Sequence, residues 1–412
     1  MRTDRETADL LIAEWEIDRD WSAIAASAVG LVFSVGTLTL YSFGVFIHPL
    51  VQEFGWSRGQ LSAAVAIGQY AFALSSLLWG VLLDRLGPRA TILPAVVGLG
   101  FGFASLSLLT PHLWHFYLVF AIVPFLAGAA SPLGYAAVLV RRFSGRLGLA
   151  LGLALMGVGL GAALLPPLAQ SLVTSLGWRA AYGILGAITL VLTFPAAMVA
   201  TRNTHGPAAH IGNGPRSSVF PLLGTRAFIL ISLCFILLGT ASVGTLAHLI
   251  PMMTDRGFSP AAAARIAGIT GVATLVSRSG IGWLLDRLHA PYVLGVVSLV
   301  ATGSGLLLLY GRGSLSSYFA AVFLGVVAGA EVDFIAFLVR SYFGPAVFGH
   351  LYGIAFGIFI VGSGTGPLLM GYSFDRFHQY RQGLIFFVVL ELAAAAVTLA
   401  MPSYGRYRLE NT

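Results

Sequence analysis

One arginine, Arg278, lies in the middle of an apolar segment, where a charge is expensive. Small and apolar residues surround it for two helical turns on each side. An arginine at membrane depth costs about 2.5–3.5 kcal/mol on insertion scales, and its planar guanidinium suits a carboxylate. The eight residues from Arg278 to Asp286 place it ~12 Å into the membrane. We therefore expect Arg278 to bind an organic anion or to form a buried salt bridge.

Two carboxylates, Glu331 and Asp333, lie at a similar depth in another apolar segment. They precede Arg340, at the end of that segment, by nine and seven residues, or ~10–14 Å along a helix. Side chains two residues apart on a helix point about 200° apart, so both acids cannot face Arg278. We expect one to face a cavity, as a proton site or counter-ion, and the other to pack between helices; a purely structural pair is the alternative. We expect no third carboxylate in the membrane.

Two histidines and four aromatic residues could complete such a site. His48 and His248 lie near the outer ends of the first and seventh apolar segments, and histidine binds a proton near neutral pH. A ring that only satisfies local hydrogen bonds is the alternative for each. His112 and His115 have no carboxylate neighbour, so we expect no metal site, and no motif indicates a cofactor. The aromatic candidates for a cavity lining are Tyr41, Tyr70, Tyr135 and Phe359.

These residues must be carried by membrane-spanning helices. Of the 412 residues, 57% are hydrophobic and only 9% are charged, whereas soluble domains contain about 25% charged residues. The net charge of +7 comes from arginine alone, because the sequence contains no lysine. A P-loop lysine and a lysine Schiff base are therefore excluded. The composition also excludes a soluble enzyme and a nucleic-acid-binding domain.

Twelve apolar segments are long enough to cross a bilayer. We predict spans at 21–47, 61–83, 90–110, 115–140, 147–171, 180–200, 226–252, 260–285, 291–310, 315–340, 347–372 and 382–402. The predicted organisation is a tail at 1–20, a six-helix bundle at 21–200, a polar linker at 201–225, a second six-helix bundle at 226–402 and a tail at 403–412. With the N-terminus inside, 15 arginines fall on the inner side and 7 on the outer side. This bias predicts that both termini are cytoplasmic.

The two predicted bundles resemble each other in sequence. Residues 80–86 (GVLLDRL) recur as residues 282–288 (GWLLDRL), and Gly55-Trp-Ser recurs as Gly257-Phe-Ser, both at a shift of 202. In spans five and eleven, glycines and a proline recur at a shift of 201. Two parallel six-helix repeats are typical of alternating-access transporters, whose substrate site lies between the repeats near the bilayer midplane.

Residues 80–89 (GVLLDRLGPR) resemble the signature loop between the second and third spans of the major facilitator superfamily. The resemblance implies the twelve-helix major facilitator fold. It also implies a conformational gate at the cytoplasmic helix ends, where Asp84 neutralises arginines in one conformation only. The gate residues expected on this basis are Asp84, Arg85, Arg89, Arg141, Asp286, Arg287 and Arg340.

Within that superfamily, three passages are similar to the monocarboxylate transporter family and its bacterial relatives, the oxalate:formate antiporters among them. These are residues 146–157 (RLGLALGLALMG), residues 44–49 (GVFIHP) and Arg278, at the position of the family's substrate-binding arginine. Two features depart from the family. Thr274 replaces an acid one turn before Arg278, and span eleven contains no arginine or lysine, only His350. The second departure favours a monoanion over a dicarboxylate held by two cations.

The residues and the resemblance together predict a secondary active transporter, not an enzyme. We expect it to move a small organic anion, a monocarboxylate, by proton symport or by exchange across the inner membrane of a bacterium. Its expected partners are the anion, the proton and the lipid bilayer, without nucleic acid or an obligate protein partner. The alternative is a proton-coupled drug or metabolite exporter of the same fold, which would need an acid in the first bundle to attract cationic drugs.

Overall fold

The computed structural model describes residues 21–143, 147–202, 204, 220–285, 287–343 and 348–403, and these residues form helices without a strand. The first half contains α2 (Trp21–Val32), η1 (Thr37–Tyr41), α3 (Phe43–Phe54), α4 (Arg58–Leu86), α5 (Pro88–Ser105), η2 (Leu106–Leu108), α6 (Leu113–Leu126), α7 (Pro132–Arg142), α8 (Leu147–Ile188), η3 (Thr189–Thr193) and α9 (Phe194–Ala200). The second half contains α10 (Phe220–Leu223), α11 (Arg226–Asp255), α12 (Pro260–Leu285), α13 (Ala290–Tyr310), α14 (Gly313–Phe343), α15 (Phe348–Phe377) and α16 (Arg381–Leu399).

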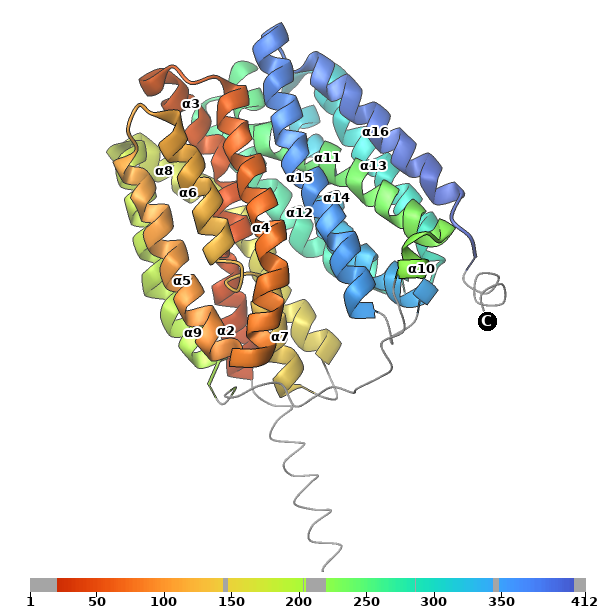
Figure 1. Ribbon diagram of the computed structural model, residues 1–412. Coiled ribbons are helices and arrows are strands. Elements are labelled where there is room, and N and C mark those ends of the chain that lie inside the picture. The colour runs from red at the N-terminus through yellow and green to blue at the C-terminus, as the bar shows by residue number, and fades with distance from the viewer. Residues whose placement is uncertain are drawn as a thin grey trace, which may run out of the picture.

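The helices of the two halves form two groups that lie side by side (Figure 1). In that view α4 and α15 lie close together at the top and separate toward the bottom. We call the bottom the linker end, because α9 ends there at Ala200 and α11 begins there at Arg226. The opposite end, where α4 and α12 begin, is called the far end.

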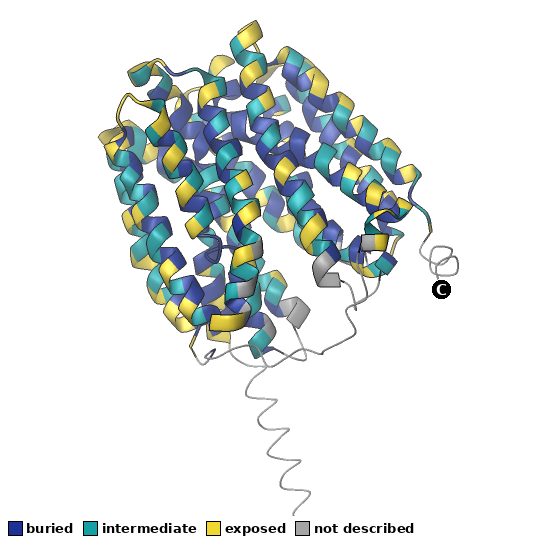
Figure 2. Ribbon diagram, viewed as in Figure 1, coloured by how far each residue is buried: buried dark blue, intermediate teal, exposed yellow. Residues whose placement is uncertain are grey.

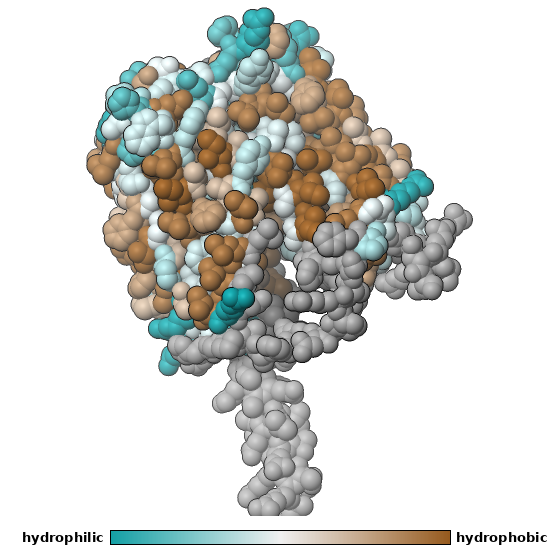
Figure 3. Space-filling view, viewed as in Figure 1, coloured by the Kyte–Doolittle hydropathy of each residue, from teal (hydrophilic) through white to brown (hydrophobic). Residues whose placement is uncertain are grey.

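Ten helical stretches of the described residues are long and apolar enough to cross a membrane. One of them, Ala150–Ala200, contains the non-helical residue Gly177 (φ 82°, ψ 162°) and therefore runs as two arms. The shorter apolar helix Leu113–Leu126 continues, after a break, as α7. This arrangement is compatible with twelve spans, but their number stays a prediction. Apolar side chains cover the flank of the molecule (Figure 3), as contact with lipid requires.

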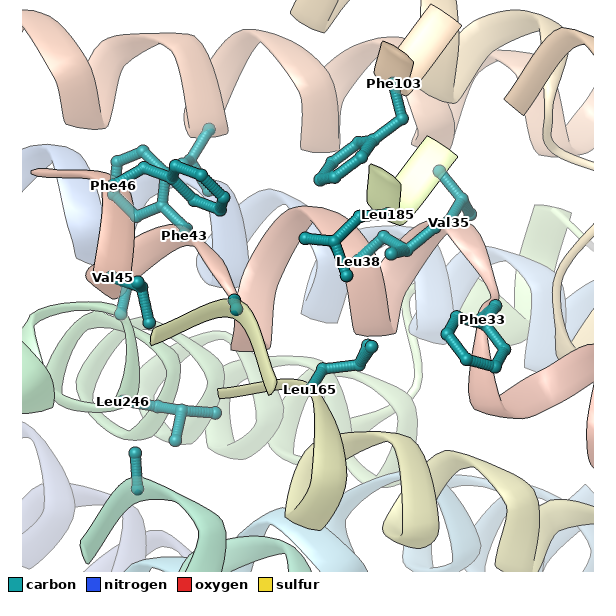
Figure 4. Packing of buried hydrophobic residues seen from close by; sticks show 14 of the residues in the cluster. Phe33, Val35, Leu38, Phe43, Val45, Phe46, Phe103, Leu165, Leu185 and Leu246 are labelled. Carbon is teal, nitrogen blue, oxygen red and sulfur yellow. The ribbon is translucent and has the colours of Figure 1, made fainter. Parts of the chain in front are cut away.

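Two helices of the first half are interrupted at the same place. α2 leads through the π-helix η1 into α3, and residues 127–131 separate α6 from α7. The two interruptions touch, because the Val35 N–H donates a hydrogen bond to the Ala130 carbonyl at 3.3 Å. Buried hydrophobic side chains pack around this segment (Figure 4). π-Helical turns often occur at functional sites, and this one ends at Tyr41.

The turns at Gly55 and Gly257, which the sequence repeat aligns, both have a glycine with a positive φ angle. Their φ angles are 69° and 87°, a region that favours glycine because it has no Cβ. Gly55 ends α3 before α4 begins, and Gly257 follows α11 before α12 begins. The repeat in sequence is therefore also a repeat in turn geometry.

The hydrophobic core joins the two halves at the far end. One cluster of buried residues combines Leu38 and Phe120 of the first half with far-end residues of the second half, such as Leu249 and Met370. A second cluster, around Phe235 and Leu338, gathers fully buried residues of the second half alone, toward its linker end. Figure 2 shows the buried residues concentrated where the two groups of helices meet in the upper part of the view.

Candidate functional site

Arg278 lies on the face of α12 that turns toward the first half. Gly271 approaches the backbone of Ala163 in α8 so closely that a Cβ would overlap it, and the Cβ of Leu275 is 3.1 Å from a Cβ built on Gly159. Helix residues three, four or seven apart share one face, so Arg278 continues the stripe of Gly271 and Leu275. The stripe directs Arg278 into the space between the two groups of helices.

The guanidinium of Arg278 is half-buried and keeps an unsatisfied donor. Its Nε is buried and finds no hydrogen-bond acceptor in the described part of the chain. Asp333 of α14, Tyr352 of α15 and Tyr41 of η1 lie within electrostatic range of it. The site therefore combines three helices of the second half with the broken helix of the first half. A carboxylate between the halves would find a half-buried guanidinium and phenolic hydroxyl groups.

Thr274, where the family resemblance expects an acid, does not neutralise Arg278. Its hydroxyl is 2.8 Å from the Thr270 carbonyl and 3.0 Å from the Gly325 carbonyl, so it connects α12 to α14. Asp333 is the acid in electrostatic range of Arg278, but no direct ion pair joins the two among the described residues.

Glu331 and Asp333 point in different directions, as their spacing predicts. Glu331 is 3% exposed, and its Oε1 lies 2.5 Å from the hydroxyl oxygen of Ser242 in α11. Asp333 is only partly buried and faces Arg278 and Tyr352. The structure thus places Asp333 at the space between the halves and Glu331 among the helices of the second half.

The expectation that the membrane contains no third carboxylate is wrong. Glu391 of α16 is 3% exposed, and its Oε2 has no hydrogen-bond partner in the described part of the chain. It lies within electrostatic range of Glu331. The signal was present in the sequence, because Glu391 is an acid within the predicted span 382–402.

His248 is fully buried where α11 meets α4 and α15, and its hydrogen bonds are satisfied. Its Nε2 lies 3.1 Å from the Pro367 carbonyl and 2.9 Å from the Ser62 hydroxyl, and its Nδ1 lies 3.2 Å from the Tyr380 hydroxyl. A carbonyl only accepts, so Nε2 carries the ring proton and Nδ1 accepts from Tyr380. Of the two interpretations, this geometry favours the locally satisfied ring.

The other predicted lining residues are scattered. His48 is exposed on α3. Tyr70 of α4 is hydrogen-bonded to Thr365 of α15 across the two halves at 2.7 Å. Tyr135 is fully buried against α2, and Phe359 is 6% exposed and packs on α11. Of the aromatic candidates, the structure brings Tyr41 to Arg278.

The predicted gate residues lie at the linker end, and the structure describes only some of them. Arg85, Arg287 and Arg340 are exposed, and Arg89 and Arg141 are partly buried. Arg141 donates to the Leu83 carbonyl at 2.9 Å, a contact within the first half. The side chain of Asp84 and the whole of Asp286 lie outside what the structure describes.

An ion pair that the sequence analysis missed joins the two halves at the far end. Arg58, at the start of α4, donates two hydrogen bonds to Asp255 of α11, at 2.6 and 2.9 Å. The same guanidinium donates to the Tyr380 hydroxyl at 2.6 Å and lies 3.9 Å from the centre of the Phe374 ring. Bidentate pairs of this kind are geometrically specific.

Asp375 of α15 makes a second far-end contact between the halves. Its Oδ2 accepts hydrogen bonds from the Ser57 hydroxyl at 2.6 Å and from the Gly59 N–H at 2.8 Å. Ser57 is the N-cap of α4, so Asp375 binds the positive end of that helix dipole. The far end is therefore closed by polar contacts as well as by the core. Within the described ranges, no three His, Cys, Asp or Glu side chains could hold a metal ion.

Comparison with known proteins agrees with this architecture. Residues 28–367 match the model of the Major Facilitator Superfamily. The chain is 28% identical to monocarboxylate transporter 13 of Rattus norvegicus, over 91% of this chain and 86% of the relative. It is 26% identical to the 3-(3-hydroxy-phenyl)propionate transporter of Escherichia coli K12 (83% and 85%) and 26% identical to multidrug resistance protein MdtG of Escherichia coli O1:K1 / APEC (87% and 86%).

The fold also matches a solved transporter structure. A bacterial homologue of the human lysosomal transporter Spinster aligns with a TM-score of 0.74 at 14% identity, over 95% of this chain and 98% of that one. The apolar helices, the arginine between two groups of helices and the family match lead to one conclusion. The chain belongs to the Major Facilitator Superfamily and is a multi-pass membrane transporter.

Proposed function

We propose that this transporter carries a small organic anion with one carboxylate, bound by Arg278 between the two halves. The observation that supports this most is the buried Nε of Arg278, on the face of α12 directed at the first half, which lacks an acceptor among the residues that the structure describes. A carboxylate supplies such an acceptor and neutralises the charge. The printed names of two relatives, a monocarboxylate and a 3-(3-hydroxy-phenyl)propionate transporter, also refer to carboxylates.

Coupling to a proton follows from the position of Asp333. An ionised Asp333 attracts Arg278 and competes with the substrate carboxylate, whereas a protonated Asp333 leaves the guanidinium to the substrate. Anion and proton would then bind together, which gives symport. Exchange of one anion for another needs no release of the proton. His248 is a weaker candidate for coupling, because both of its ring nitrogens are already engaged.

The linker end is proposed to face the cytoplasm of a bacterium and the far end to face outward, across the inner membrane. The arginine bias of the sequence supports this orientation. The contacts of Arg58, Asp255 and Asp375 at the far end support the further proposal that this conformation is inward-open, with Arg278 reached from the cytoplasm.

The test is uptake of radiolabelled benzoate, L-lactate and 3-phenylpropionate into proteoliposomes, with Arg278→Lys as the variant. Lysine keeps the charge but cannot form two parallel hydrogen bonds, so we expect at least a tenfold loss, equivalent to about 1.4 kcal/mol. Arg265→Lys is the matched control, because Arg265 is exposed on the same helix. Near-normal uptake by Arg278→Lys, or no uptake of any acid by the wild type, would reject the anion site.

The alternative is a proton-coupled exporter of drugs, which the similarity to MdtG supports. Such a carrier would need an acid in the first half to attract cations. In the described first-half residues, Glu53 is exposed at the far end and is already hydrogen-bonded to Trp178 and Arg179. Export of a cationic dye that Arg278→Lys leaves unchanged would favour this function over anion transport.

A further inference from the structure

Two carboxyl groups of the second half, Glu331 and Glu391, are buried and near each other. Each side chain is 3% exposed, and they lie within electrostatic range of each other. Their helices both flank α11: Glu331 of α14 contacts it at Ser242, and the Sγ of Cys234 in α11 lies 3.8 Å from the Ala394 carbonyl of α16. Two like charges in such a setting cannot both persist, because burial and mutual repulsion act in the same direction.

The contacts of the Ser242 hydroxyl bear on whether Glu331 is protonated. Its Oγ is 2.5 Å from Glu331 Oε1 and 2.7 Å from the Leu238 carbonyl oxygen. The hydroxyl has one proton to donate, and the carbonyl can only accept. Each contact has a proton of its own when Glu331 is protonated and donates to Ser242 while Ser242 donates to Leu238, and the short 2.5 Å distance supports this arrangement over a shared proton.

Glu391 has the environment of a neutral acid. Its Oε2 is buried without a hydrogen-bond partner among the described residues and points toward α13, 3.4 Å from a Cβ built on Gly305. A charged carboxylate left in this way would cost several kcal/mol. The titratable residues of α13, Tyr292 and Tyr310, are exposed at its two ends and do not face the cluster.

Charged or titratable groups also lie on α11, α12, α14, α15 and η1. Cys234 of α11 is close to Glu331 but carries no positive charge. On α12 the nearest charge is Arg278, which interacts with Asp333 of α14 and Tyr352 of α15. Tyr41 of η1 lies within electrostatic range of both Arg278 and Glu331, so the cluster borders the proposed anion site through this tyrosine.

We propose that Glu331 and Glu391 form a second proton-binding site, distinct from Asp333 and buried inside the second half. In the described conformation both carboxyl groups are protonated, and Glu331 is the member next to the anion site. Loss of its proton would place a negative charge near Tyr41 and weaken binding of an anion at Arg278. This consequence rests on the proposed function, whereas the proton site itself does not.

The test is infrared spectroscopy of the purified protein near pH 7, which distinguishes the carbonyl stretch of a protonated carboxyl group from the bands of a carboxylate. The variants are Glu331→Gln, Glu391→Gln, Ser242→Ala and, to identify its own contribution, Asp333→Asn. We expect Glu331→Gln and Glu391→Gln each to remove one protonated-carboxyl band. Ser242→Ala should shift the frequency of the Glu331 band and leave the Glu391 band in place. Glu53→Gln, an exposed acid, is the matched control and should remove none.

Protonated-carboxyl bands that are unchanged in both glutamine variants, or a wild-type spectrum without such bands near pH 7, would overturn the proposal. The wild-type spectrum decides the matter even if a variant does not fold. A second measurement concerns transport of radiolabelled benzoate. Glu391→Gln should lose at least half of the accumulation driven by a pH gradient, while exchange at equal pH stays within about twofold. Because the spectra need no substrate, failure of the anion site would leave this proposal standing.

Discussion

The two ends of the interface between the halves differ in how closely the helices approach. At the far end, Gly364 and Gly371 of α15 touch α4, where an added Cβ would lie 2.9 Å from the Tyr70 ring and 2.8 Å from the Ser62 hydroxyl. Seven residues toward the linker end, Gly357 meets nothing within 4 Å. Residues seven apart share a helix face, so one glycine stripe is packed at the far end and open at the linker end.

The same contrast occurs on α8, which the sequence repeat aligns with α15. Gly159 packs against Leu275 of α12, whereas Gly152, one heptad closer to the linker end, has open space around it. Small residues allow membrane helices to approach closely. Only part of each glycine stripe contacts a neighbouring helix in this conformation. This fits a carrier whose halves rock, because the glycines that are now free would contact the opposite half when the linker end closes.

The largest expected effect comes from forcing the far end apart at Gly271. A side chain there would overlap the Ala163 backbone, so Gly271→Leu should destabilise this conformation by about 3 kcal/mol. The measurement is labelling of Ala66→Cys, buried near Gly364, by a membrane-impermeant maleimide in a Cys234→Ala background. We expect more than a tenfold faster reaction.

Gly280→Leu is the control for that experiment. Gly280 lies on the opposite face of α12 and meets nothing within 4 Å, so its substitution should leave labelling and thermal stability nearly unchanged. Equal labelling in the two variants would show that the α8–α12 contact does not close the far end.

The next effect in size concerns the ion pair that crosses the far end. Asp255→Asn keeps the shape but removes the charge that holds Arg58 in a bidentate geometry. Because the two side chains are 13% and 35% exposed, we expect a cost of about 1–2 kcal/mol and five- to thirtyfold faster labelling of Ala66→Cys. Unchanged labelling would mean that the core alone keeps this end shut.

Much of the fold, but less of the site, could be predicted from the sequence. Apolar segments and the repeat predict the helices, because a bilayer allows few other structures. Arg278 could be predicted as a site residue because a charge within an apolar segment stands out in the sequence. Glu391 could have been singled out in the same way, because it is also a charged residue within an apolar segment. The pair of Arg58 and Asp255 could not be found, because both residues lie at helix ends, where charges are common and their partners depend on the packing of distant helices.

A smaller effect is expected at the open end of the glycine stripe. Gly357→Ala should leave the stability of the described conformation unchanged, because the new methyl group has room. It should slow transport about fivefold, since the linker end could no longer close fully at a cost of about 1 kcal/mol. Gly364→Ala, on the same face, is the comparison and should instead speed far-end labelling. Normal transport by Gly357→Ala would argue that α4 and α15 do not meet there.

The smallest effect is expected for an ion pair at the far end that stays within one half. Glu53 of α3 accepts hydrogen bonds from Trp178 and Arg179 of α8, and these bonds hold the pKa of Glu53 below its ordinary value of 4.5. The lowered pKa means that this stabilisation is complete above that value and is lost as the pH falls through the pKa of the folded state. Since both charged side chains are more than two-fifths exposed, Glu53→Gln should cost no more than about 0.5 kcal/mol at neutral pH. Thermal unfolding should show that small difference near pH 7, and the difference should shrink as the pH falls below 4.5. Because Glu53 does not touch the second half through these bonds, labelling of Ala66→Cys should not change; faster labelling in Glu53→Gln would mean that charges within one half also help to close the far end.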